Sequence, residues 1–375
     1  MSDVRKVLIV GGGFAGLSLA IGLRRLEVEV DLIDSDPGGT AVGAGLSLNG
    51  ATLKALKRVD GGVFERLRAA GHMHSGFSLH KSSGELLQKI VPPDDGTGMP
   101  QGGGILRPVL HRILSDATRD SGARVRLGVT LAEVQQRGPE VWTRCSDGEE
   151  GVYDLVVAAD GLYSAVRAMI FPAAPRPRFT GQGCWRAVFP RPPGLDCVAM
   201  YIDSERKAGL NPISPDEMYL FLLESVPDNR RMPPEQWSQL LAERMRAFGG
   251  TIAALADSLD GNAHINYRPL EMILLPKPWY VGGVLLIGDA AHATTPHMAY
   301  GCGLAVEDAV VLAELVDTGT SVPDILERFM ERRYERCRMV VEGSVKLGEL
   351  EIAHASMAEH QAVSATIGRA IAQPI

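Results

Sequence analysis

The first part of the chain shows the hydrophobic pattern of a strand, a turn, a helix and a second strand. Residues 7–10 are all apolar, as a central strand of a parallel sheet requires. Apolar residues then recur at helical spacing from Leu17 to Leu26, and residues 28–33 predict the next strand. The N-terminus is therefore predicted to form a β–α–β unit.

Similar elements return twice further along the chain. Between about residues 109 and 160 the pattern predicts a helix, a strand near Val125, a hairpin around Val141 and an apolar strand over 155–159. Another apolar strand is predicted over 284–287. Two regions rich in Pro and Gly, about 75–104 and 172–280, separate these stretches and contain aromatic strands such as 218–223. An α/β domain interrupted by a second domain accounts for this order.

Composition and charge narrow the classes of protein. The chain has 375 residues, 45% of them hydrophobic and 22% charged, which is enough apolar material for a large core. The formal net charge of −7 argues against a nucleic-acid partner. The sequence shows no signal-peptide pattern and no uncharged run long enough to span a membrane, so we expect neither a signal peptide nor a membrane-spanning segment.

The cysteines and histidines do not form a recognisable metal or disulfide pattern. The five cysteines are scattered and lack a CxxC pair, which favours a reducing cytoplasm. His72 and His74 have the spacing of metal ligands, but no third ligand lies near them in the sequence, so we assign no metal.

A glycine-rich turn follows the first strand. Residues 11–16 read GGGFAG and fit the GxGxxG pattern between a strand and a helix, where glycines allow a pyrophosphate to approach the backbone. The helix N-terminus offers N–H groups and the positive end of its dipole to the phosphates. Asp34, at the end of the second strand, is placed to accept hydrogen bonds from a ribose. The turn predicts a dinucleotide site, with NAD or FAD favoured over NADP.

The strand over 284–287 also ends in residues suited to a ligand. Gly288 and Asp289 follow it, which places Asp289 at the sheet edge where open α/β folds bind ligands. Pro296, Gly301 and Gly303 come next and lead into a helix predicted from about Leu304. The positive end of that helix can face negative charge on a reduced ring, which favours a flavin.

These motifs occur together with the stretch 157–161, Ser164 and Arg167. The combination resembles the class A FAD-dependent aromatic monooxygenases, which form the p-hydroxybenzoate hydroxylase fold group. It is similar to members that hydroxylate salicylate, urate and 6-hydroxynicotinate. The resemblance covers roughly residues 5–345. It implies an α/β fold with an α+β substrate region, in which a Rossmann-like FAD/NAD(P)-binding domain is interrupted by a mixed-sheet substrate domain and followed by C-terminal helices. It also implies tight, noncovalent FAD, NADH or NADPH as a transient co-substrate, and hydroxylation of a small aromatic or N-heteroaromatic substrate with O₂ through a flavin hydroperoxide.

The resemblance assigns roles position by position. Arg107 would reach the phosphate–ribityl region of FAD and Asp289 the ribityl chain, and Asp160 belongs to a second nucleotide motif that also serves NAD(P)H. Tyr300 stands where the family commonly has Gln. The residues implied for the cofactor are Gly11, Gly13, Phe14, Ala15, Gly16, Asp34, Gly45, Arg107, Asp160, Asp289, Gly301 and Gly303.

Substrate contacts follow from the same resemblance. Tyr219 is interpreted either as a ligand of a ring hydroxyl or as an ordinary sheet tyrosine. His297 is interpreted either as the base that activates the substrate or as a structural turn histidine. The candidates for catalysis are His297, Tyr219 and Pro296, and those for substrate binding are Arg206, Lys207, Asn211, Tyr219 and His297.

Other functions stay open at this point. A flavin-dependent reductase or halogenase of the same fold is one alternative, although the WxWxIP pattern of halogenases is absent, and a non-catalytic FAD-binding scaffold is another. A monomer or a homodimer is expected. In the C-terminal helices, arginines at 332, 333, 336 and 338 alternate with glutamates, which predicts a salt-bridged face toward solvent.

The predicted domain division follows the motifs. Residues 1–75, 102–175 and 281–345 form a discontinuous FAD-binding domain, residues 76–101 and 176–280 the substrate domain, and residues 346–375 a C-terminal helical tail.

Overall fold

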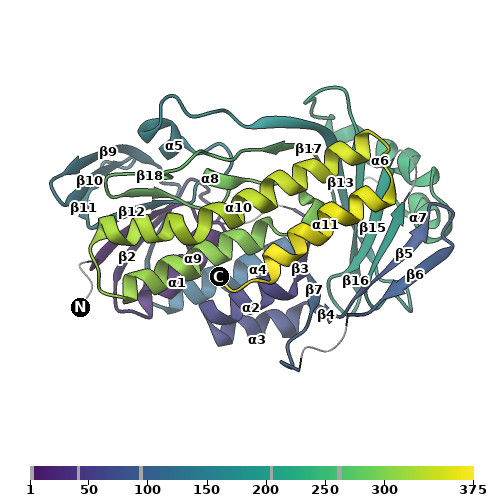
Figure 1. The fold of residues 1–375 in the computed structure, drawn as a ribbon, viewed down its shortest axis with the longest axis horizontal. Coiled ribbons are helices and arrows are strands. Elements are labelled where there is room, and N and C mark those ends of the chain that lie inside the picture. The colour runs from purple at the N-terminus through teal and green to yellow at the C-terminus, as the bar shows by residue number, and fades with distance from the viewer. Residues whose placement is uncertain (1–3, 40–42, 93–95, 203–205, 260–263) are drawn as a thin grey trace.

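The computed structural model describes residues 4–39, 43–92, 96–202, 206–259 and 264–375. Two large sheets lie at opposite ends of the molecule in Figure 1, and long C-terminal helices run across both. The α/β fold with a second, mixed-sheet region that the sequence predicts is confirmed.

The first sheet has six strands in the order β18–β19–β12–β1–β2–β8. All neighbours are parallel except β18 and β19. Its central strand, β1, has four consecutive buried residues, which explains the unbroken apolar run in the sequence. The strands are β1 (Lys6–Val10), β2 (Glu29–Asp34), β8 (Arg124–Leu127), β12 (Leu155–Ala158), β18 (Tyr280–Val281) and β19 (Val284–Leu286).

Helices and a small sheet complete this unit. The helices are α1 (Phe14–Arg24), α4 (Arg107–Asp120), α5 (Ala165–Ile170), α8 (Asp289–His292) and α9 (Gly301–Asp317), and α1 packs against both α4 and α9. A meander of β9 (Leu131–Arg137), β10 (Glu140–Cys145) and β11 (Glu150–Tyr153) shares the same hydrophobic core through Val141 and Tyr153. The core is therefore covered on both faces.

The second large sheet has seven strands in the order β17–β13–β16–β15–β14–β5–β6. They are antiparallel except for β14 beside β5. One face packs on α6 (Trp237–Arg246) and α7 (Gly250–Leu255) through Trp185, Leu220 and Leu241. The strands are β5 (Phe77–Lys81), β6 (Leu86–Ile90), β13 (Arg178–Pro190), β14 (Val198–Ile202), β15 (Arg206–Pro212), β16 (Glu217–Ser225) and β17 (Ile265–Met272).

A three-stranded sheet of β3 (Gly45–Asn49), β7 (Gly102–Leu106) and β4 (His72–His74) joins the two units, together with α2 (Gly50–Val59) and α3 (Gly61–Ala70). Gly104 of β7 lies so close to β15 that a Cβ there would stand 2.1 Å from the Pro212 carbonyl oxygen. Tyr219 and Asn211, on the face of the seven-stranded sheet away from α6, contact Ser47 of β3, so this face meets the first unit.

The C-terminal helices are α10 (Val322–Ile352) and α11 (Met357–Ala372). In Figure 1, α10 spans from the six-stranded sheet to the seven-stranded one, and it contacts both α9 and β13. The predicted boundary between residues 345 and 346 falls inside α10, because its buried stripe continues through Val345, Leu347 and Leu350 without a helix-breaking signal. Among the described helices none is long and apolar enough to cross a membrane.

Candidate functional site

The glycine turn between β1 and α1 has the geometry of a phosphate cradle. Gly11 has φ of +110°, and a Cβ there would lie 2.4 Å from the carbonyl oxygen of Ala159, so only glycine fits. A Cβ on Gly16 would lie 2.0 Å from the carbonyl oxygen of Gly11, so Gly16 allows close contact of helix and turn. A Cβ on Gly13 would meet nothing within 4 Å, which leaves open space at the start of α1.

A cavity of about 380 Å³ opens beside this turn. Its lining includes Gly11, Gly13 and Asp34 from the first β–α–β unit, and Asp160 and Gly161 from the end of β12. The Asp34 carboxylate accepts from the backbone N–H groups of Gly12 at 2.5 Å and of Asp36 at 2.7 Å. A carboxylate has about four acceptor positions, so capacity for a ribose hydroxyl remains.

Asp160 uses its carboxylate mainly within the protein. It accepts from Ser164 Oγ and from the backbone N–H of Val166, at the start of α5. Arg167 on α5 donates to the carbonyl oxygens of Ala290 at 2.8 Å and Leu162 at 2.7 Å, which ties this motif to the segment after β19. The Asp160 motif, which lines the cavity, is thus connected to the segment that contains Asp289.

Arg107, at the start of α4, and Asp289, at the start of α8, act electrostatically on each other. Both residues are accessible to water. Desolvation lowers the pKa of Arg107 and raises that of Asp289, and each charge partly opposes the shift of the other. The Arg107 guanidinium also lies 4.9 Å from the centre of the Phe14 ring.

These residues fit a bound FAD. The open space at Gly13, the backbone N–H groups of the turn and the Arg107 cation suit a pyrophosphate. Asp289 makes no hydrogen bond or ion pair with any residue in the described part of the chain, which leaves its oxygens free for hydroxyl groups. The side chain of Tyr300, the N-cap of α9, does not cap the first turn, so the leading N–H groups remain available to a ligand.

The small residues predicted to bind the cofactor differ in how much space surrounds them. Ala15 packs against Gly288, and Gly45 against the Tyr219 ring, where a Cβ would lie 2.0 Å from Cδ1. A Cβ on Gly301 would make an ordinary contact, 3.4 Å from the Thr294 methyl group. A Cβ on Gly303 would instead collide with the Tyr300 ring at 2.4 Å, so Gly303 permits helix packing.

A buried group of charges supports the turn that contains Asp289. Asp308 accepts from the Gly288 N–H at 2.8 Å, from His292 Nε2 at 2.6 Å and from Arg333 Nε at 2.7 Å. Although burial opposes ionisation, His292 and Arg333 lower the pKa of Asp308 to about 2. Burial likewise opposes charge on His292, but Cys337 and Asp308 raise its pKa well above the usual value. The hydrogen bonds of His292 and Arg333 to Asp308 account for the proximity of His292, Asp308 and Cys337.

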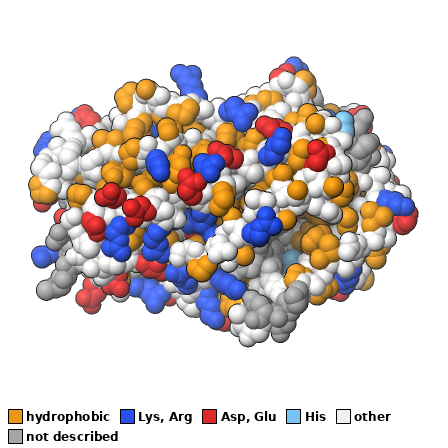
Figure 2. All heavy atoms as spheres, viewed as in Figure 1, with side chains coloured by type: hydrophobic (Ala, Val, Ile, Leu, Met, Phe, Trp, Pro, Cys, Tyr) orange, Lys and Arg blue, Asp and Glu red, His pale blue; other side chains and the backbone are white. Residues whose placement is uncertain are grey.

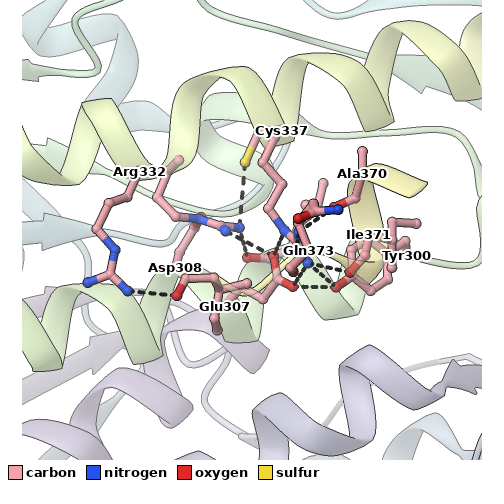
Figure 3. A network of polar contacts seen from close by, with 12 residues as sticks. Tyr300, Glu307, Asp308, Arg332, Cys337, Ala370, Ile371 and Gln373 are labelled. Atoms are coloured by element: carbon pink, nitrogen blue, oxygen red, sulfur yellow. Dashed lines mark hydrogen bonds and ion pairs between the residues drawn. The ribbon is translucent and has the colours of Figure 1, made fainter. Parts of the chain in front are cut away.

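The same network reaches the C-terminus, as Figure 3 shows. Arg333 and Arg336 both pair with Glu307, and Tyr300 donates to Glu307 as well. Arg336 also donates to the carbonyl oxygens of Ala370, Ile371 and Gln373, at 2.6–3.0 Å.

The predicted solvent face on α10 is therefore partly wrong. Arg338 is exposed and pairs with neighbouring glutamates, and Figure 2 shows such mixed charges on this face. Arg333 and Arg336 are buried, however, because α9 and the end of α11 cover their side of α10. Their buried partners, Glu307 and Asp308, lie in the apolar helix α9. Two acidic residues in an otherwise apolar helix indicate buried cationic partners, and this signal in the sequence could have identified the pairing.

On the substrate side, Tyr219 and Asn211 come together between the two units. Tyr219 Oη lies 2.6 Å from Ser47 Oγ, and Asn211 Nδ2 donates to the same oxygen at 2.8 Å. Burial raises the pKa of Tyr219, so its hydroxyl stays protonated near neutral pH. Asn211 is fully buried, and its Oδ1 has no partner among the described residues. Ser47 was not predicted from the sequence.

His297 does not point to open space. Its side chain has no exposed surface; Nδ1 lies 2.9 Å from Thr295 Oγ1, and Nε2 lies 3.0 Å from Gln182 Oε1 and 3.3 Å from Glu351 Oε2. Both ring nitrogens are thus engaged by the protein. The prediction that His297 offers a base to the substrate is not supported by this arrangement; the structural interpretation of the histidine fits it. Pro296, the first residue of a short 3₁₀ turn, is half-buried.

The structure separates the two predicted basic residues of β15. Successive strand residues point to opposite faces. Lys207 shares the face of Asn211 and pairs with Glu351 at 3.1 Å. Arg206 lies on the face toward α6, 3.8 Å from Glu224, and is therefore not brought to the site.

Comparison with known proteins agrees with this geometry. Residues 5–344 match the family described as FAD binding domain. The chain belongs to this FAD-binding family. It is 32% identical to the aurachin C monooxygenase/isomerase of Stigmatella aurantiaca over 92% of this chain and 89% of that protein. It is 30% identical to 2-heptyl-3-hydroxy-4(1H)-quinolone synthase of Pseudomonas aeruginosa, over 92% and 89% of the two chains.

A solved structure shares the fold. Klebsiella pneumoniae HpxO, complexed with FAD and uric acid, aligns with a TM-score of 0.84 and 22% identity over 100% of this chain and 94% of that one. The predicted resemblance to class A FAD-dependent monooxygenases is confirmed, as is the enzyme class, an FAD-dependent monooxygenase.

Proposed function

We propose that this enzyme uses NAD(P)H and O₂ to hydroxylate a small aromatic or N-heteroaromatic substrate. The observation that carries the proposal is the meeting of the two units at Gly45. The backbone N–H of Arg107 donates to the carbonyl oxygen of Ala44. Gly45, which follows Ala44, packs on the ring of Tyr219 in the seven-stranded sheet. The cofactor-binding residues and the polar face of β15 and β16 are thereby neighbours. Relatives named for a quinolone product and a neighbour holding uric acid support a heteroaromatic substrate.

For the cofactor, we assign FAD, held tightly and noncovalently. The turn of Gly11, Gly13 and Gly16 would bind the pyrophosphate with Arg107, Asp34 the adenosine ribose, and Asp289 the ribityl hydroxyls. When bound, FAD reduced by NAD(P)H supplies the activation of O₂ and delivers one oxygen atom to the ring.

The protein's own groups orient the substrate. Tyr219, protonated and fixed by Ser47, would exchange hydrogen bonds with a polar group of the ring. For Asn211, which is fully buried, we assign a positioning role, since its Nδ2 donates to Ser47 Oγ and thereby holds the hydroxyl that contacts Tyr219. For His297 we assign a positioning role, since its contacts to Thr295 and Gln182 hold the turn after Pro296.

Other properties follow as parts of the same proposal. All five cysteines are free, which supports a reducing, cytoplasmic location. We retain the division into a discontinuous FAD-binding domain and a substrate domain, and a monomer or homodimer as the assembly.

The test is substrate-dependent turnover by the purified holoenzyme. NAD(P)H oxidation and O₂ uptake are followed with hydroxybenzoates, hydroxypyridines, quinolones and purines, and isotopically labelled O₂ identifies the transferred atom by mass spectrometry. A product that gains one labelled oxygen supports the proposal. NAD(P)H oxidation that reduces a candidate without gain of oxygen would favour a reductase. No NAD(P)H oxidation with any candidate would favour a scaffold. Tyr219→Phe is expected to raise the KM for substrate, with more H₂O₂ formed per NAD(P)H.

A further inference from the structure

A strand made of glycines lets polar side chains meet where the two units join. Gly104 of β7 pairs with Ser47 of β3, and Gly102 of β7 pairs with His74 of β4. A Cβ on Gly104 would stand 3.1 Å from Asn211 Oδ1, and a Cβ on Gly102 would stand 3.0 Å from His74 Cε1. The two glycines face the same side of β7, since positions two apart in a strand share a face. Ser47, Asn211 and His74 therefore lie over one glycine strand.

Two of these side chains carry buried polar atoms without partners. Asn211 is fully buried; its Nδ2 donates to Ser47 Oγ at 2.8 Å, and its Oδ1 has no hydrogen-bond partner among the described residues. Both ring nitrogens of His74 are shielded from water and also lack a partner in the described ranges. The Asn211 side chain acts on the pKa of His74, so the two groups are neighbours. A hydrogen bond from His74 to Asn211 Oδ1 would satisfy one atom of each, and buried polar groups left unpaired are unfavourable.

His74 is uncharged at neutral pH. Burial and the neighbouring His72 lower its pKa to about 4, while Asn211 and the backbone of Gly76 oppose this shift. His72 in turn lies 3.1 Å from Arg191. A neutral imidazole has one N–H group and one bare nitrogen. The nitrogen of His74 that faces Asn211 Oδ1 would carry the hydrogen.

Asn211 sets the direction of the hydrogen bonds that end at Tyr219. Ser47 Oγ accepts from Asn211 Nδ2 and lies 2.6 Å from Tyr219 Oη, its other partner in the described part of the chain. The hydroxyl hydrogen of Ser47 therefore has Tyr219 Oη as its acceptor, which leaves the hydrogen of Tyr219 for a substrate. Turning the amide by half a turn would exchange its oxygen and nitrogen and reverse this order. Tyr219 would then donate to Ser47 and could only accept from a substrate.

We propose that His74 is a positioning residue that sets hydrogen-bond specificity: by donating to Asn211 Oδ1 it holds the amide in this orientation and keeps the Tyr219 hydroxyl a donor. The inference rests on the proposed contact between Tyr219 and the substrate. It favours a ring that presents a hydrogen-bond acceptor to Tyr219 over a ring that presents only a donor. His74 acts through Asn211 and Ser47 and need not touch the substrate.

The first test is a pH titration of ¹⁵N-labelled histidine by NMR in the FAD-loaded enzyme, with the His74 signals assigned from His74→Gln. The ring is expected to stay uncharged at neutral pH. Asn211→Asp replaces the amide with a carboxylate of the same shape, which should raise the pKa of His74 toward its usual value of about 6.5. An unchanged titration of His74 in Asn211→Asp would show that the two side chains do not interact, and would overturn the proposal.

The second test is equilibrium binding, followed by the visible spectrum of the flavin without NAD(P)H. The probes are 1-naphthol and 1-naphthylamine, which have nearly the same shape and are uncharged at neutral pH. The hydroxyl oxygen accepts hydrogen bonds better than the aryl amine nitrogen. The wild type should bind 1-naphthol roughly three- to tenfold more tightly, the effect of one neutral hydrogen bond. Asn211→Asp, whose carboxylate can only accept, should remove or invert this preference.

Substitutions of His74 separate positioning from packing. His74→Phe removes both ring nitrogens and should lose the preference for 1-naphthol. His74→Gln can still donate to Asn211 and should keep most of it. His80→Gln is the matched control and should leave the preference unchanged, because the His80 ring stacks on Tyr201 in the core beside α6. FAD content and the flavin spectrum show that each variant is folded.

The outcomes separate this inference from the proposed function. No preference between the probes in the wild type, or an unchanged preference in His74→Phe, overturns the inference. Equal losses in His74→Gln and His74→Phe also overturn it, because they would show that the ring is needed for packing alone. Neither measurement includes turnover, so the expected preferences without any oxygen transfer would support the inference and refute the proposed function.

Discussion

Arg336 offers a direct test of the buried charge network. Its side chain is 8% exposed and Glu307 is 1% exposed, with Nε 2.8 Å and Nη2 2.5 Å from the two carboxylate oxygens. The same guanidinium bonds three carbonyl oxygens at the end of α11, residues 370, 371 and 373. Arg336→Met keeps the volume but removes every one of these donors.

The expected loss is large because the partners stay buried. Breaking a buried ion pair by removing one side typically costs about 3–5 kcal/mol. Arg333 remains 2.9 Å from Glu307, which favours the lower part of that range. Unfolding entropy is roughly 2.1 cal/mol/K per residue, so for a chain of this length 1 kcal/mol shifts Tm by roughly 1.3 °C. We expect Arg336→Met to lower Tm by roughly 4–5 °C.

Arg338→Met on the same helix is the matched control. Arg338 is 38% exposed and pairs with Glu335 and Glu342, within one turn of the helix on either side. Such surface pairs contribute about 0.3–0.5 kcal/mol each, so its Tm should change by less than about 1.5 °C. Thermal unfolding is followed by circular dichroism at one saturating FAD concentration for all variants. Equal shifts in the two variants would refute the claim that the buried network stabilises the fold.

Further predictions concern the cofactor site and acid stability. Gly13→Ala should leave the Tm of the FAD-free protein nearly unchanged but weaken FAD binding. Gly11→Ala should destabilise even the FAD-free protein, because its Cβ would lie 2.4 Å from a carbonyl oxygen. Fluorescence titration with FAD and thermal melts distinguish the two variants. Asp289→Ala should raise the Kd for FAD by roughly 10- to 100-fold, the loss of a charge-assisted acceptor, in the same titration. The pKa of Glu351 is depressed in the folded state, so its contribution is complete above the unfolded pKa, about 4.3, and is lost as the pH falls below it. The Tm difference between wild type and Glu351→Gln should therefore shrink as the pH is lowered below about 4.5, and a constant difference would contradict this pairing.

The cofactor side of the molecule was largely predictable because its signals are local. A strand, a glycine turn and a helix adjoin one another in the chain, and the φ of +110° at Gly11 is the reason that a glycine stands there. Asp34 and Asp289 follow apolar strands, and the carboxyl ends of parallel strands share one edge of a sheet. Both residues accordingly lie where the sequence predicted.

The substrate side was less predictable, because its contacts join distant segments. Ser47 carried no sequence signal, and its role depends on β3 meeting β15 and β16, more than 160 residues away. Likewise, the contacts of His297 with Gln182 of β13 and Glu351 of α10 decided between its two interpretations.

By itself, the sequence determined the central strands of the cofactor unit, the glycine turn and the side of each strand on which a residue lies, since these depend on chain neighbours and on the period of the strand. Alternation already puts Arg206 and Lys207 on opposite faces. Only the tertiary structure decided which face meets the cofactor unit, which cations find carboxylates and which do not. The arginines of α10 illustrate this point: Arg336 and Arg338 are two residues apart, and one is buried and the other exposed because α9 and α11 pack against one side of the helix.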